Sequence, residues 1–272
     1  MLEIPEAQTV AGQLKEAVVG KTITHAVAAA SPHGFAWYFG DPALYGEMLE
    51  GRTVTDAAAY GGRPEIWLAD MRISFGDGVN VRYFAAGAKR PAKHQLLLEF
   101  DSGDAVCCTV QMYGGLWAFQ DGLNDDFYYN VAKEKPSPLS AAFDMAYFNS
   151  LLTGDTQKLS AKAFLATEQR IPGLGNGVLQ DILWSAKIHP KRKMSTLSDG
   201  EFEILYNTVK SLLSEMTALG GRDTEKDLFG KPGGYSTTMS KKNDGGPCPV
   251  CGALIRRMAY MGGNVYVCEG CQ

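Results

Sequence analysis

Four cysteines near the C-terminus have the spacing of metal ligands. They form two C-x-x-C pairs, Cys248-Pro-Val-Cys251 and Cys268-Glu-Gly-Cys271, with sixteen residues between the pairs. This spacing is typical of a zinc ribbon, in which four thiolates surround one ion tetrahedrally and leave no coordination position open. Two disulfides are the alternative, and they would require an oxidising compartment. We therefore predict one structural zinc ion bound by these four cysteines.

A glycine-rich turn in the second half of the chain has the residues of an anion-binding site. In residues 171–190, IPGLGNGVLQDILWSAKIHP, three glycines (Gly173, Gly175 and Gly177) surround Asn176 and a helical pattern follows. Backbone N–H groups at the start of a helix point toward an anion, and the helix dipole adds attraction. The Asn176 side chain is placed to donate to the same anion. On these residues alone, a plain helix–helix connection explains the turn equally well.

The remaining pattern divides the chain into a β-rich part and a helical part. Apolar residues at helical spacing predict a helix over residues 5–19, and short alternating segments bounded by Gly and Asp turns follow it. Among these segments, residues 95–110 have the pattern of a β-hairpin. Pro136-Ser-Pro138 marks a boundary, after which the spacing is helical over residues 139–219. Residues 220–247 are rich in Gly, Lys and Asp, so we expect this segment to be too polar to pack.

Composition indicates a globular protein of two domains plus the ribbon. The chain has 272 residues, of which 45% are hydrophobic and 21% charged, and its net charge is −4. Residues 1–150 carry 11 Lys and Arg against 18 Asp and Glu, whereas residues 151–272 carry 15 against 12. A phosphate-binding surface is therefore expected in the second half. We find no signal-peptide pattern and no apolar run of membrane-spanning length, which predicts a cytoplasmic protein.

In this order, the features resemble those of the formamidopyrimidine-DNA glycosylase / endonuclease VIII family of base-excision repair enzymes. The likeness runs nearly end to end and takes in Glu3-Ile-Pro-Glu6, Lys93-His94, residues 171–190, Gly220-Gly221, Lys231-Pro-Gly-Gly-Tyr235 and the cysteine ribbon. The resemblance implies an α+β fold with DNA bound in the cleft between its parts. Those parts are an N-terminal β-sandwich with a flanking helix (1–137), a helix–two-turns–helix DNA-binding domain (138–219), a mobile loop (220–243) and a C-terminal zinc ribbon hairpin (244–272).

The resemblance also implies a reaction at the N-terminus. Members of the family flip a damaged base out of the duplex, and an N-terminal proline amine attacks the sugar C1′ to form a Schiff base that leads to strand cleavage. The matching residues are Leu2 for the amine and Glu3 for the carboxylate that handles protons on the sugar. Leu2 departs from the proline, and a large second residue predicts that Met1 is retained. A retained Met1 places the free amine about 3.5 Å further along the chain.

Other positions are implied to contact DNA. A phosphate grip is expected from the turn and the β-domain, at Gly175, Asn176, Arg63, Lys93 and His94, where Arg63 replaces a lysine of the family. The hairpin arginine that touches phosphate in the family has no counterpart in Gly262-Gly263-Asn264. Arg256 or Arg257 is expected to compensate for it. The residues expected to fill the gap left by a flipped base are Ile73, Met112 and Tyr113.

We therefore expect a DNA N-glycosylase and AP lyase that acts as a monomer on damaged or abasic duplex DNA. The loss of the proline weighs against turnover, so the alternative is a non-catalytic protein that binds DNA or structured RNA on the same scaffold. A protein–protein adaptor is a third hypothesis, favoured if no phosphate binding occurs. The sequence does not specify which base is recognised.

Overall fold

The N-terminal half is a sheet that packs around one helix. The computed structural model describes residues 2–272. Helix α1 (Ile4–Val18) begins with Pro5 in its first turn, and the apolar face formed by Val10, Leu14 and Val18 is buried in the core of the sheet. This element confirms the helix expected over residues 5–19.

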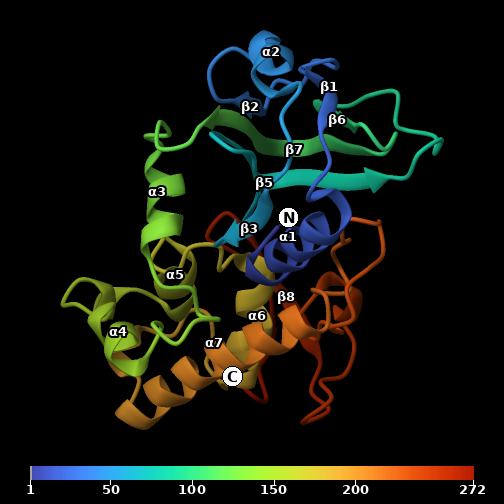
Figure 1. Cartoon of the computed structure of the whole chain (residues 1–272). Coiled ribbons are helices and arrows are strands. Elements are labelled where there is room, and N and C mark those ends of the chain that lie inside the picture. The colour runs from blue at the N-terminus through green and yellow to red at the C-terminus, as the bar shows by residue number, and fades with distance from the viewer. Residues whose placement is uncertain (1) are drawn as a thin grey trace.

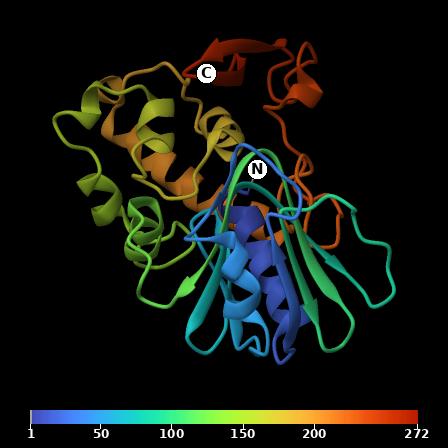
Figure 2. The same ribbon diagram turned by 90° about the horizontal axis from the view of Figure 1, so that it is seen from above.

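Seven strands form one twisted sheet in the order β1-β6-β7-β5-β4-β3, with β2 added to β7. Neighbouring strands are antiparallel except for β2, which runs parallel to β7. The two long strands β5 and β7 bend, and α1 lies between the two wings of the sheet (Figure 2). The hairpin expected over residues 95–110 is confirmed by β6 and β7. The bounds are β1 (Ile23–Ala28), β2 (Ala36–Tyr38), β3 (Asp56–Tyr60), β4 (Arg63–Trp67), β5 (Met71–Phe84), β6 (Leu96–Phe100) and β7 (Ala105–Gln120), with the short helix α2 (Tyr45–Leu49) between β2 and β3.

The second half is helical and has its own core. Aromatic rings of Phe148, Phe164 and Phe202 meet at the centre of this core, and Ile4 of α1 extends into it. Because the remainder of α1 belongs to the sheet core, α1 holds the two halves against each other. The helices are α3 (Phe127–Glu134), α4 (Met145–Ser150), α5 (Ala161–Ala166), α6 (Asn176–Ser185) and α7 (Asp199–Ala218) (Figure 1).

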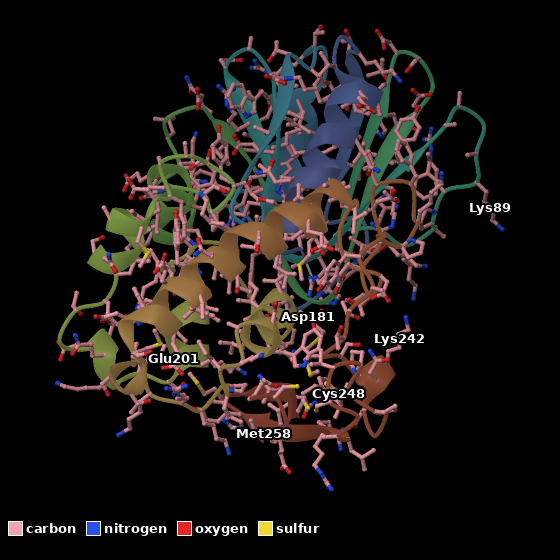
Figure 3. The ribbon with its side chains drawn as sticks, turned by 90° about the horizontal axis from the view of Figure 1, so that it is seen from below. Lys89, Asp181, Glu201, Lys242, Cys248 and Met258 are labelled. Carbon is pink, nitrogen blue, oxygen red and sulfur yellow. The ribbon has the colours of Figure 1, made fainter. Side chains whose placement is uncertain are left out.

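Residues 220–243 have little regular structure, but they pack against both halves. Leu228 is buried in the core of the sheet, and Met239 packs with the ribbon. The buried carboxylate of Asp181 on α6 accepts the N–H groups of Thr238 and Met239 at 3.0 and 2.5 Å (Figure 3). The expectation that this segment is too polar to pack was therefore wrong, because groups elsewhere in the molecule satisfy its polar backbone.

The chain ends in a hairpin of β8 (Ile255–Tyr260) and β9 (Gly263–Cys268) that packs on α6. Trp184 of α6 contacts the small core of the hairpin, and the side chain of Gln180 accepts the N–H of Tyr266 at 2.7 Å. Helix α6 therefore carries the glycine-rich turn at its start and the ribbon along its side. Within residues 2–272, none of the helices is long and apolar enough to cross a membrane.

Candidate active site and nucleic-acid interface

Glu3 joins the start of the chain to the glycine-rich turn. Its Oε1 and Oε2 accept the backbone N–H groups of Gly177 and Val178 at 2.8 and 2.7 Å. The N–H of Ile4 donates to the carbonyl of Gly173 at 3.0 Å. The turn does hold an anion at a helix start, but two of the N–H groups expected to face a phosphate are taken by the Glu3 carboxylate. Glu3 is only 4% exposed, so it is a buried part of the site.

A buried arginine that the sequence did not single out completes this centre. Nε and Nη2 of Arg222 donate to the two oxygens of Glu6 at 2.9 and 2.8 Å, and its backbone N–H donates to Glu6 at 3.0 Å. Nη1 of Arg222 lies 3.6 Å from Oε2 of Glu3. Gly177 leaves the space for this guanidinium, because a Cβ at position 177 would lie 1.5 Å from Nη1. No motif in the sequence distinguishes this arginine from any other cation in a polar segment.

Two carboxylates therefore share one guanidinium in a buried site. Burial raises the pKa of Glu3; Arg222 opposes the rise, Glu6 adds to it, and the two helix N–H groups oppose it. Burial disfavours the charge of Arg222, but the carboxylates of Glu3 and Glu6 outweigh this and raise its pKa above the ordinary value. Glu6 has the two-point contact with Arg222, whereas Glu3 accepts two backbone N–H groups and lies 3.6 Å from Nη1 of the same guanidinium.

Two cavities open on either side of Leu2. One, of about 280 Å³, lies between the β3–β4 turn, α3 and the glycine-rich turn, and Arg63 and Gly175 contribute to its walls. The other, of about 250 Å³, lies between β5, β7 and residues 224–226. Leu2 lines both cavities, so the start of the chain forms part of the wall between them. Met1, which was expected to carry the amine, lies outside the described residues.

The tip of the β8–β9 hairpin meets Asn176. Nδ2 of Asn176 donates to the carbonyl of Asn264 at 3.0 Å, and Nζ of Lys162 on α5 donates to the carbonyl of Tyr260 at 2.8 Å. A Cβ at Gly263 would lie 3.8 Å from Nδ2 of Asn176 and 3.9 Å from Nζ of Lys162. The glycine-flanked asparagine and the ribbon therefore share one face. Lys162 is a further cation at this point, which the sequence analysis missed because no motif surrounds it.

Arg63 faces the first cavity from the sheet. Its guanidinium carbon lies 4.4 Å from the centre of the Trp117 ring, a cation–π contact that fixes the side chain. Nη1 of Arg63 is buried and has no hydrogen-bond partner among residues 2–272. Gly76 makes room for it, since a Cβ there would lie 2.7 Å from Nη1. Arg63 therefore contributes a positive charge to the wall of the first cavity, while its unpaired Nη1 is enclosed against Gly76.

One of the residues expected at the interface is buried, and two others lie outside the cavities beside Leu2. Ile73 is fully buried in the middle of β5, where it pairs with β4 and β7, so it is incompatible with the gap-filling role expected of it. Lys93 and His94 belong to the β5–β6 connection, which protrudes from the molecule at Lys89 (Figure 3). Neither residue lines one of the two cavities beside Leu2.

The two hairpin arginines lie near the start of β8 and not at the hairpin tip that meets Asn176. Arg256 and Arg257 line a shallow hollow with Asp244 and Leu254, and Nε of Arg257 lies 4.0 Å from Asp244. The hairpin contributes carbonyl oxygens rather than a cation at Asn176. Of the remaining gap-filling candidates, Met112 is exposed and Tyr113 is half-buried, and both line the second cavity.

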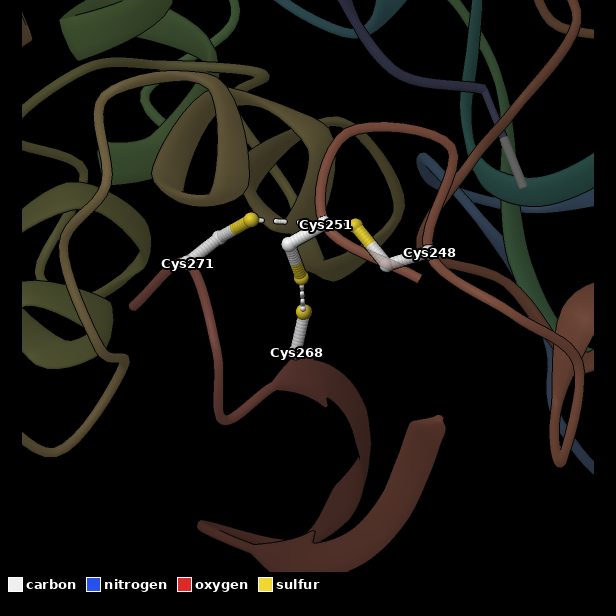
Figure 4. Close-up of side chains that lie close together, drawn as sticks. All are labelled: Cys248, Cys251, Cys268 and Cys271. Carbon is white, nitrogen blue, oxygen red and sulfur yellow. Dashed lines mark hydrogen bonds between the residues drawn. The ribbon is translucent and has the colours of Figure 1, made fainter. Parts of the chain in front are cut away.

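The four cysteines of the ribbon form a cluster that can hold a metal ion (Figure 4). Their Sγ atoms all lie within 4.8 Å of one another. The distances are 3.7 Å between Cys248 and Cys271 and 3.3 Å between Cys251 and Cys268. Thiolates about 2.3 Å from a tetrahedral zinc ion would lie about 3.8 Å apart, whereas a disulfide requires about 2.05 Å. The cluster therefore fits a metal ion and does not fit two disulfides.

Comparisons with known sequences and structures find proteins that are similar to this chain over nearly its whole length. Residues 135–227 match the model of the formamidopyrimidine-DNA glycosylase H2TH domain. The chain is 29% identical to the formamidopyrimidine-DNA glycosylase of Symbiobacterium thermophilum, over 100% of the chain and 89% of that relative. It is also 29% identical to the protein of that name from Cronobacter sakazakii, over 100% of both chains. In fold it is similar to Lactococcus lactis Fpg in complex with DNA that contains an abasic site, with a TM-score of 0.83, 22% identity and 99% of each chain covered. It is likewise similar to MutM (Fpg) from Thermus thermophilus, with a TM-score of 0.82, 23% identity and 99% and 98% of the two chains covered.

Proposed function

Because this chain belongs to the formamidopyrimidine-DNA glycosylase / endonuclease VIII family, we propose that it is a DNA-repair protein that binds damaged or abasic duplex DNA between its two halves. It acts on that DNA as a glycosylase and AP lyase, as a single copy of the chain. The observation that carries the proposal is the pair of hydrogen bonds from Gly177 and Val178 to Glu3. They place the start of the chain, its two cavities and the glycine-rich turn in one site.

The phosphate backbone is bound by cations that surround this site. Arg63 supplies positive charge on the wall of the first cavity, and Lys162 supplies it beside the hairpin tip, where Nζ of Lys162 and Nδ2 of Asn176 donate to hairpin carbonyls. Contacts of this kind position a duplex without reading its sequence. The turn itself contributes less to phosphate binding than its sequence suggests, because Glu3 uses two of its N–H groups.

Chemistry then takes place where the chain begins. The terminal amine attacks the sugar C1′, and the bond to the base breaks with its electron pair leaving on the base, which takes up the proton that the nitrogen loses. The C1′–O4′ bond then breaks with its electron pair leaving on O4′, while the nitrogen lone pair forms the C=N bond of the Schiff base. The flipped base occupies the cavity of about 250 Å³ formed by β5, β7 and residues 224–226. Glu3 exchanges the proton with the opening sugar ring, which its position beside Leu2 allows.

We infer that the ion held by Cys248, Cys251, Cys268 and Cys271 is zinc, because four thiolates in tetrahedral range are its preferred structural ligand set. A bound zinc ion closes the ribbon and supplies no catalytic position. The consequence for this chain is mechanical, since the ribbon holds the β8–β9 hairpin against Asn176 and Lys162.

Borohydride trapping on a duplex with one abasic site tests the proposal. A covalent adduct that is lost in Glu3→Gln, a variant of the same shape, supports the reaction described above. Tight binding of the abasic duplex without any adduct would favour the non-catalytic alternative, and no preference for abasic over intact duplex would overturn the repair function. The intact mass of the purified chain shows whether Met1 or Leu2 carries the reacting amine.

A further inference from the structure

Strand β7 carries a three-residue bulge beside the second cavity. The pairing of β5 and β7 runs to Asp77 opposite Gly114 and resumes at Val79 opposite Val110. Residues 111–113 thus face a single residue of β5, Gly78, and must project from the sheet. The backbones are in close contact here, because a Cβ at Gly78 would lie 2.5 Å from the carbonyl oxygen of Tyr113. The bulge therefore stands on a rigid base.

Strand β2 adds aromatic side chains to this bulge. It pairs in parallel with the residues of β7 that follow the bulge, with Trp37 opposite Gly115. The N–H of Gly114 donates to the carbonyl of Phe35 at 3.0 Å, which fixes the approach of β2. The rings of Trp37 and Tyr113 lie 5.8 Å apart between centres, with 31° between their planes. We name Phe35, Trp37, Met112 and Tyr113 the aromatic ridge.

The aromatic ridge is apolar, exposed and continuous with the proposed site. Met112, Phe35 and Trp37 are 71%, 63% and 46% exposed. Grouped exposure of large apolar side chains marks a binding surface. Met112 and Tyr113 also line the cavity that Leu2 lines, so the aromatic ridge begins where that cavity ends. In Figure 2 the connection into β2 and the bends of β5 and β7 rise together toward the second half, beside the N-terminus.

We propose that the adjacent rings of Trp37 and Tyr113 enter the gap left by a flipped base and that the indole N–H of Trp37 donates a hydrogen bond to the unpaired base opposite. This inference rests on the proposed function. Aromatic faces stack on nucleic-acid bases whatever the base, and apolar wedges hold kinked duplexes open. The indole has a donor and no acceptor, so it satisfies an acceptor on the edge of the orphaned base.

Fluorescence anisotropy with intact duplex and with abasic duplexes carrying each of the four opposite bases tests this pair. Trp37→Ala is expected to weaken binding of abasic duplex roughly 5- to 100-fold, the range of one lost base–aromatic stack, and to change binding of intact duplex by less than about twofold. Trp37→Phe keeps a ring and loses the N–H, so it should retain most of the affinity while its preference among opposite bases changes. Ile204→Ala, at an exposed apolar residue of α7, is the matched control and should behave as the unchanged chain.

The outcomes separate this inference from the function on which it rests. If the unchanged chain does not prefer abasic over intact duplex, the repair function fails and the role of Trp37 and Tyr113 fails with it. If that preference exists and survives in Trp37→Ala, or if both duplexes lose affinity equally, only the role of Trp37 is overturned. If Trp37→Phe matches the unchanged chain with all four opposite bases, the hydrogen bond from the indole is overturned. Circular dichroism in the near ultraviolet checks that each variant is folded.

Discussion

Replacement of Gly177 by alanine is expected to destabilise this protein by about 2–5 kcal/mol, although alanine is the better helix former by up to about 1 kcal/mol. Gly177 is the second residue of α6 and has no left-handed backbone, so the methyl group adds no backbone strain. The new Cβ would lie 1.5 Å from Nη1 of Arg222 and 2.9 Å from Oε1 of Glu3, so the guanidinium must move. Displacing it leaves the buried carboxylates of Glu3 and Glu6 uncompensated, and loss of one partner from a buried ion pair costs about 3–5 kcal/mol.

The physical cause can be isolated with a second variant. In an Arg222→Ala background the guanidinium is absent, so Gly177→Ala should change the free energy of unfolding by no more than about 1 kcal/mol in either direction. Urea unfolding followed by tryptophan fluorescence measures all four members of this cycle. A coupling energy of at least about 2 kcal/mol is expected between positions 177 and 222. Additive effects, or a Gly177→Ala chain as stable as the unchanged one, would refute the packing argument.

Three further outcomes follow from the structure. Removal of the metal by a chelator, or Cys248→Ser, should release one zinc ion per chain and weaken DNA binding. A colorimetric assay measures the released zinc, and fluorescence anisotropy measures the loss of binding. Undiminished binding by the metal-free chain would contradict the role given to the hairpin. Lys162 is only 5% exposed and its Nζ holds the carbonyl of Tyr260, so Lys162→Ala should loosen the hairpin and weaken binding of every duplex alike. Because Lys162 acts through the hairpin, the slope of log K against log salt should change by less than about 1, which a salt titration measures. The hydrogen bond from Lys21 lowers the pKa of Asp104 from its ordinary 3.8 to about 2. Because the pKa of Asp104 is lower in the folded than in the unfolded chain, its contribution to stability is complete above the unfolded pKa and is lost as the pH falls from about 4 to 2. Asp104→Asn should therefore be less stable than the unchanged chain at pH 5–7. In thermal melts it should lose less stability between pH 4 and pH 2.

Local spacing was sufficient for some parts of the site. The cysteine pairs could be assigned to a metal because ligand spacing within a knuckle is a property of adjacent residues. The glycines around Asn176 likewise predicted a turn before a helix, and α6 begins there. The gap-filling role predicted for Ile73 was wrong, because that role depends on how strands pair and not on local spacing. The projecting residues of this sheet are set by a register shift between β5 and β7, and a bulge of that kind leaves no pattern in either strand by itself.

The sequence alone determined the division into a β-rich half, a helical half and a metal-binding ribbon, together with the helix that begins the chain. These features depend on the periodicity of apolar residues and on the spacing of residues close in sequence. Both are properties of the sequence itself and do not require the folded structure. Only the tertiary structure decided which anion occupies the turn, because Glu3 and Gly177 are separated by 174 residues. It also decided that Arg222 lies between two carboxylates and that Trp37 stands beside Tyr113. Such contacts are set by how two cores and a shared helix pack together, and packing is a property of the whole chain.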